Sequence, residues 1–276
     1  MINVLRLEFF RLKKSKLFWI LLGVTAVLPI ITALASSLIL SIIDAITSTD
    51  ASMGNLAEQF RSSVTTSIMS SLGMVGYGAT LLPLITASVV LSKEFADGTM
   101  RNAILANKKR GELYFAYLII ALTVGASYML AFMLTSLIII APIYGFGGLS
   151  AGQAVSAVFC SFALGILSVA FAQSCACMFL FAVRKQWATI LFPILITLLV
   201  PDIMNTVIVL ITTVLGMQGE GLSYTATSWI PFYNATLYDA GAIDGALVGK
   251  IALYYVLFTA IFTVSGYFTF EKADLK

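Results

Sequence analysis

The chain has 276 residues, of which 60% are hydrophobic and 11% are charged, and its formal net charge is +3. A soluble domain carries about 25% charged residues, so this composition excludes a water-covered globular surface and indicates a protein embedded in lipid. The absence of histidine removes the commonest general base and the commonest metal ligand. Cys160, Cys175 and Cys177 lie in apolar stretches, where we expect reduced thiols and neither a metal site nor a disulfide framework.

Residues 1–16 are predicted to form a short amphipathic helix. Leu5, Phe9 and Leu12 recur at helical spacing, and the basic residues among them suit an anionic membrane surface. The alternative is a basic flank of the first span with no surface role. The apolar run that follows is too long for the core of a signal peptide, so we expect it to remain as the first span. The residues predicted to lie at the membrane interface are Arg6, Phe9, Arg11, Lys13, Lys14 and Trp229.

Charge-free runs define the spans, because each crossing of a bilayer needs about 20 apolar residues. The run from Leu113 to Val183 carries no charge and is far too long for one crossing. Pro142 and the glycines that follow it predict a turn that divides this run in two. The full predicted order is an interfacial helix at 1–16, a span at 17–43, an outer loop at 44–71, a span at 72–92, a cytoplasmic loop at 93–112, spans at 113–143, 154–183 and 187–213, an outer or re-entrant segment at 214–250, and a span at 251–270.

The fifth span is interrupted by Pro201 and Asp202. Either Asp202 lies within the membrane, where a charge is costly and often functional, or Pro201 ends the span and Asp202 lies at the interface, which is the interpretation we favour. Farther along, Pro231 and Phe232 follow Trp229. Aromatic residues of this kind mark the water interface, or else they belong to a re-entrant gate. The candidate gate residues are Asp202, Pro231 and Phe232.

The basic residues predict the orientation of the six spans. With an inside N-terminus, only Arg61 and Lys250 among the 16 Lys and Arg residues fall in outer segments. We therefore predict an all-α polytopic membrane protein with six transmembrane helices and both termini in the cytoplasm. Within the spans, Tyr77, Tyr128 and Gln173 are among the polar candidates for a pathway surface, although interfacial positions explain most tyrosines equally well.

The loop at 93–112 carries the clearest functional pattern. Gly98 permits a tight turn and Thr99 can cap a following helix. Met100 and Ile104 then provide a small apolar face on a short cytoplasmic helix. Such a helix suits the docking of another protein. The alternative is a basic retention loop with no partner.

This loop, with Glu94, Gly98-Thr99, a short helix and Lys109-Arg110, resembles the loop between spans two and three of ABC-2 type transporter permeases. The opening LEFFRLKKSKLFWILL is similar to the start of the same family, and the six-span plan extends the resemblance over one transmembrane domain, 1–276. At the level of residues the resemblance covers 2–20 and 92–112. It implies a coupling helix that contacts a separate ATPase through Glu94, Phe95, Gly98, Thr99, Met100, Arg101, Ile104 and Leu105.

The resemblance implies a permease of the bacterial cytoplasmic membrane that exports an antimicrobial peptide, such as a lantibiotic or bacitracin, or a drug. The chain contains no G-x-x-x-x-G-K-[ST] phosphate loop, so ATP and Mg are expected on two copies of a partner ATPase, and none of the chain's own residues is expected to be catalytic. A second permease copy, identical or not, is implied, and no nucleic acid is expected. An intramembrane enzyme is disfavoured because the sequence lacks histidine and also lacks paired acids within the predicted spans. A membrane scaffold or sensor that docks an ATPase without transport remains the alternative.

Overall fold

The computed structural model describes residues 2–49, 77–96, 110–144, 151–183, 185–200 and 245–272, together with residues 203, 206, 207, 210, 211 and 214. Every regular element within these ranges is a helix, which confirms the all-α class for them. The elements are α1 (Ile2–Lys14), α2 (Lys16–Thr49), α4 (Tyr77–Ala96), α6 (Arg110–Tyr144), α7 (Ala151–Val183), α8 (Gln186–Ile194), the π-helix η2 (Leu195–Leu199) and α11 (Gly245–Glu271).

Four helices in the described ranges are long and apolar enough to cross a membrane, namely α2, α6, α7 and α11. The chain is therefore a multi-pass membrane protein. Two further apolar helices, α4 and α8, are shorter. The count of six spans and the sidedness of the termini stay predictions. Some helices extend past the predicted spans: α2 runs on to Thr49 and α11 begins at Gly245, because backbone hydrogen bonding continues where the apolar composition ends.

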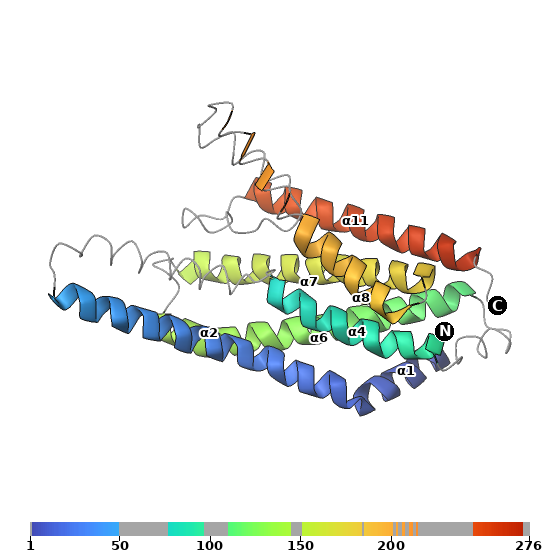
Figure 1. Cartoon of the computed structure of the whole chain (residues 1–276), viewed down its shortest axis with the longest axis horizontal. Coiled ribbons are helices and arrows are strands. Elements are labelled where there is room, and N and C mark those ends of the chain that lie inside the picture. Colours follow the sequence, from blue (N-terminus) through green and yellow to red (C-terminus); the bar gives the residue numbers. More distant parts are fainter. Residues whose placement is uncertain are drawn as a thin grey trace.

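The helices α2, α4, α6, α7 and α11 run roughly along one long axis (Figure 1). Helix α6 packs against α2, α4 and α7, and α7 packs against α11, α6, α8 and α4. In the most apolar stretch of each span, 50% of α6 and 61% of α7 is buried, against 22% of α2 and 17% of α11. Helices α6 and α7 therefore form the centre of the bundle, and α2 and α11 present apolar side chains outward, which lipid or a partner can cover.

Glycine allows α6 and α7 to approach closely. A Cβ at Gly125 on α6 would collide with Val169 on α7, and one at Gly165 on α7 would collide with the methyl end of Met129 on α6. Each helix thus provides a glycine opposite a larger side chain of the other. Small residues at such positions let transmembrane helices gain dispersion contacts that lipid cannot supply.

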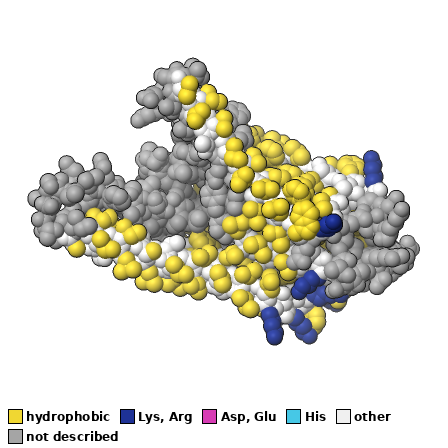
Figure 2. Space-filling view, viewed as in Figure 1, with side chains coloured by type: hydrophobic (Ala, Val, Ile, Leu, Met, Phe, Trp, Pro, Cys, Tyr) yellow, Lys and Arg dark blue, Asp and Glu magenta, His cyan; other side chains and the backbone are white. Residues whose placement is uncertain are grey.

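The end of the bundle where α4 ends and α6 begins also holds α1 and the end of α11 (Figure 1). Most of the Lys and Arg side chains visible on this face gather there (Figure 2). We call it the basic end. Helix α1 meets α2 at Ser15, whose N–H bonds the main-chain oxygen of Leu12 at 3.0 Å. The indole N–H of Trp19 donates to the oxygen of Lys13 at 2.8 Å, which satisfies a carbonyl at the end of α1.

Candidate functional site

The structure describes only part of the residues predicted for function. The interface residues Arg6, Phe9, Arg11, Lys13 and Lys14 all lie on α1, and Glu94 and Phe95 lie in the last turn of α4. The other predicted residues lie outside the described ranges, namely Gly98, Thr99, Met100, Arg101, Ile104, Leu105, Asp202, Trp229, Pro231 and Phe232. The described site is therefore the set of helices that flank residues 97–109 and the contacts that bind those helices to the bundle.

Helix α1 combines a buried anchor with an exposed apolar and basic surface. Glu8 is only 3% exposed and accepts a hydrogen bond from Arg11 at 3.0 Å. Leu12 is buried, whereas Phe9 and Phe10 are exposed. The ammonium of Lys14 lies 4.4 Å from the centre of the Phe10 ring, a cation–π distance. The sequence predicted the exposed basic and aromatic side chains, but it did not single out Glu8, because only packing decides that a carboxylate is enclosed.

Tyr128 joins three helices in the interior of the bundle. Its hydroxyl donates to the main-chain oxygen of Phe18 on α2 at 2.9 Å. It also lies 2.9 Å from the hydroxyl of Thr86 on α4, whose single proton can be donated either to Tyr128 or to the main-chain oxygen of Leu82 at 2.8 Å. All three residues are buried. The sequence had marked Tyr128 as a candidate for a pathway surface, and in this structure its polar atom is instead used between α2, α4 and α6.

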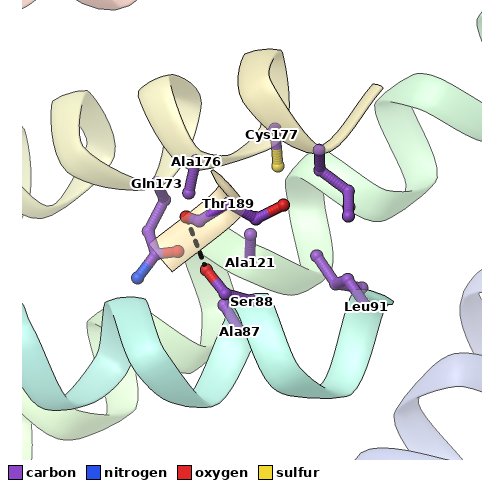
Figure 3. A pocket seen from close by; sticks show the side chains of 9 residues that line it. Ala87, Ser88, Leu91, Ala121, Gln173, Ala176, Cys177 and Thr189 are labelled. Carbon is purple, nitrogen blue, oxygen red and sulfur yellow. Dashed lines mark hydrogen bonds between the residues drawn. The ribbon is translucent and has the colours of Figure 1, made fainter. Parts of the chain in front are cut away.

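A second interhelical hydrogen bond joins α4 to α8. The hydroxyl of Ser88 donates to the main-chain oxygen of Thr189 at 3.1 Å (Figure 3). Pro193 lies four residues after Thr189 within α8 and has no N–H to donate. The oxygen of Thr189 therefore lacks its usual partner within the helix, and Ser88 supplies one from α4. The helix then widens into the π-helix η2 directly after Pro193; such π turns are frequent at functional sites.

Gln173 on α7 lies beside this hydrogen bond. Its side chain is 0% exposed, and neither its amide oxygen nor its amide nitrogen has a hydrogen-bond partner among the described residues. Its amide lies at a small packing gap that Ser88 and Thr189 also line (Figure 3). The gap has no room for a water molecule, so it is neither a substrate chamber nor a hydrated site. The other residues that line it are Ala87, Leu91, Ala121, Ala176, Cys177 and Leu180.

At the basic end, α6 is bound to α11. Arg110, the first residue of α6, donates to the main-chain oxygen of Glu271 at 2.8 Å and lies 3.5 Å from that of Phe270. A cation at a helix C-terminus satisfies free carbonyls and suits the helix dipole. One turn along, the ring of Tyr114 lies 5.1 Å from that of Phe181 on α7 and 6.2 Å from that of Tyr267 on α11. Arg110, which directly follows residues 97–109, is thus hydrogen-bonded to the end of α11.

These contacts join helices to one another and form no chemical centre among the described residues. Among the described residues there is no group of three or more His, Cys, Asp or Glu side chains that could hold a metal ion. What the arrangement provides is buried hydrogen bonds that join α4 and α6 to α2 and α8, and an exposed hydrogen bond that joins α6 to α11.

The model of the ABC-2 family transporter protein matches residues 4–201. The match includes most of α1, the whole 97–109 segment and the cluster of Ser88, Gln173 and Thr189, and it ends just after η2, so α11 lies outside it. No match was found among the curated proteins or among the solved structures. Because the matched residues make up most of the sequence, the chain belongs to the ABC-2 family of transporter proteins.

Proposed function

We propose that this chain is the permease subunit of an ATP-driven ABC exporter in a bacterial cytoplasmic membrane. Membership of the ABC-2 family supports the role of membrane subunit. The missing phosphate loop supports an ATPase on a separate chain. Two ATPase copies and two permease copies, identical or not, complete the assembly. ATP and Mg bind only to the ATPase copies.

The observation that carries the proposal is the position of residues 97–109. This segment connects α4, which ends at Ala96, to α6, which begins at Arg110. Both flanking helices have buried hydrogen bonds to other helices, from Thr86 and Ser88 on α4 and from Tyr128 on α6. When the ATPase pair closes on ATP, the segment moves, and α4 and α6 carry the movement into the bundle. The coupling contacts are Glu94, Phe95, Gly98, Thr99, Met100, Arg101, Ile104 and Leu105.

The proposed topology has six spans with both termini in the cytoplasm. It assigns the second span, 72–92, to α4, and the fifth span, 187–213, to the segment that begins with α8 and η2. The basic end then faces the cytoplasm, in accord with the excess of Lys and Arg in the predicted inner segments. Helix α1 lies along the inner surface, with Phe9 and Phe10 at the edge of the acyl chains, and Lys13 and Lys14 extend from the same side of the helix to the anionic headgroups.

The proposed substrate is hydrophobic or amphipathic, such as a lantibiotic, bacitracin or a drug. An apolar hollow of about 200 Å³ between α6 and α7 supports this chemistry, since no polar surface lines it. Such a hollow favours acyl chains or apolar side chains over ions. A substrate of this kind passes between two permease copies or enters laterally from the membrane, and Asp202, Pro231 and Phe232 are the candidate gate residues.

The direct test is co-purification of the chain with an ATPase subunit and ATP-linked export from reconstituted vesicles. Alanine at Gly98, Thr99 or Ile104 is expected to reduce assembly or to uncouple ATP hydrolysis from export. Alanine at Asn102, on the opposite side of the predicted coupling helix, is the matched control. Intact assembly and export in all three variants would rule out the coupling assignment. ATPase binding with no substrate flux would instead support the scaffold or sensor.

A further inference from the structure

Gln173 is buried in a way that needs an explanation. Its side chain is fully enclosed, and both of its amide atoms lack hydrogen-bond partners among the described residues. The gap beside it excludes water, so solvent does not satisfy the amide. A buried amide without partners destabilises the arrangement that isolates it. An aliphatic side chain of similar volume would fill the same position without that cost.

Two groups beside Gln173 have the chemistry to pair with it. The hydroxyl of Ser88 on α4 and the main-chain oxygen of Thr189 on α8 border the same gap, and at present they bond each other (Figure 3). The amide nitrogen of Gln173 can donate to the Thr189 oxygen in place of Ser88. Its amide oxygen can accept from the displaced hydroxyl of Ser88. The same groups thus support a second pattern, in which the amide bridges α4 and α8 and every polar atom is paired.

The surrounding backbone suits a change between these two patterns. Pro193 removes the N–H that would otherwise occupy the Thr189 oxygen. The π-helix at Leu195–Leu199 follows immediately, and π turns and prolines are where helices bend. Ala87, Ala121 and Ala176 line the gap with small side chains, so a small shift of α4 against α7 and α8 meets little steric resistance.

We propose that Ser88 and Gln173 alternate as the hydrogen-bond donor to the main-chain oxygen of Thr189 during the transport cycle. In the present state Ser88 holds α4 directly against α8. In the other state the Gln173 amide lies between them, and α4 has shifted relative to α8. The inference rests on the proposed function, since α4 leads into the coupling segment at residues 97–109, and it identifies Gln173 and Ser88 as positioning residues for that movement.

The first test separates exchange from simple packing. Gln173→Leu removes the unpaired amide, so the melting temperature of the purified chain is expected to rise by about 2–4 °C. The second state loses its bridging bonds, so ATP-linked export by the reconstituted complex is expected to fall about five- to tenfold. Ser168→Ala is the matched control, because that buried hydroxyl bonds within its own helix, to Gly165. An unchanged export rate in Gln173→Leu would overturn the proposal.

The second test observes the amide itself. The sequence contains Gln59, Gln153, Gln173, Gln186 and Gln218. Selective ¹⁵N labelling of glutamine side chains therefore gives a simple NMR spectrum in which the Gln173 signal is the one lost in Gln173→Leu. Its amide protons are expected to move downfield when the permease–ATPase complex binds a non-hydrolysable ATP analogue, because a hydrogen bond forms.

The decisive control needs no ATPase. In Ser88→Ala the oxygen of Thr189 is left open, so the Gln173 amide of the isolated chain is expected to shift downfield without nucleotide. A Gln173 signal that stays in place in Ser88→Ala contradicts the partner exchange, whatever the export assays show. If the Gln173 signal shifts in Ser88→Ala but no ATPase co-purifies with the chain, the partner exchange is supported and the proposed exporter is rejected.

Discussion

Arg110 and Glu271 bind the beginning of α6 to the end of α11: the guanidinium donates to the Glu271 main-chain oxygen at 2.8 Å. The two residues are 161 positions apart. Arg110 directly follows residues 97–109, so this hydrogen bond attaches α11 to the first residue after that segment. Helix α11 lies outside the region matched by the family model, and this contact attaches it to the part of the chain that the family shares.

Arg110→Gln is expected to lower the free energy of unfolding by about 0.5–1 kcal/mol, because an exposed charge-assisted bond to the carbonyls at the end of α11 is lost. Thermal unfolding of the detergent-purified chain measures the change. Lys185→Gln, which changes an exposed basic residue at the start of α8, is the control and should leave the melting temperature unaltered. Equal effects of the two substitutions would argue against a specific role for the Arg110–Glu271 contact.

Tyr128→Phe is expected to cost about 1–2 kcal/mol, because the oxygen of Phe18 loses a buried donor; the hydroxyl of Thr86 keeps its bond to the oxygen of Leu82. Tyr114→Phe provides a matched comparison. Tyr114 is equally buried, but its hydroxyl has no hydrogen-bond partner among the described residues, so its removal should be neutral or slightly stabilising. If the two variants unfold at the same temperature, the Tyr128 network does not stabilise the bundle.

Gly125→Ala is expected to destabilise the chain by about 1–3 kcal/mol, because the new methyl group overpacks against Val169. The control is Gly23→Ala on α2, where a Cβ would meet nothing within 4 Å. That substitution should stabilise the helix by about 0.5–1 kcal/mol, because alanine has a better helix propensity than glycine. Val169→Ala should partly rescue Gly125→Ala in the double variant; absence of any rescue would contradict the close approach of α6 and α7 at Gly125.

Pro193 and Ser88 are expected to be energetically coupled. Ser88→Ala alone removes the direct bond from α4 to the Thr189 oxygen and should cost about 1 kcal/mol. In a Pro193→Ala background the restored N–H of residue 193 can bond that oxygen, so Ser88→Ala should cost little. A double-mutant cycle on unfolding free energies measures the coupling. If the two changes in unfolding free energy are strictly additive, Pro193 is not the reason that the Thr189 oxygen takes its donor from Ser88.

The sequence alone determined the class of protein and the family, and it predicted the spans. These features depend on local quantities: the length of charge-free runs, the placement of Lys and Arg, and a short pattern around Gly98 and Thr99. Because a bilayer imposes the same length and polarity on every crossing, composition is sufficient to find most of the crossing helices. The predicted contact residues of the 97–109 segment and the candidate gate lie outside the described ranges and stay predictions.

Only the tertiary structure decided which polar side chains meet. Tyr128 bonds a carbonyl 110 residues away, and Ser88 one that lies 101 residues away. No local pattern indicates such pairs, because they depend on how the helices rotate and approach one another at Gly125 and Gly165. Gln173 illustrates the difference: the sequence identified a polar residue in an apolar span, and packing alone determined that its amide is enclosed, unpaired and beside the carbonyl that Pro193 leaves open.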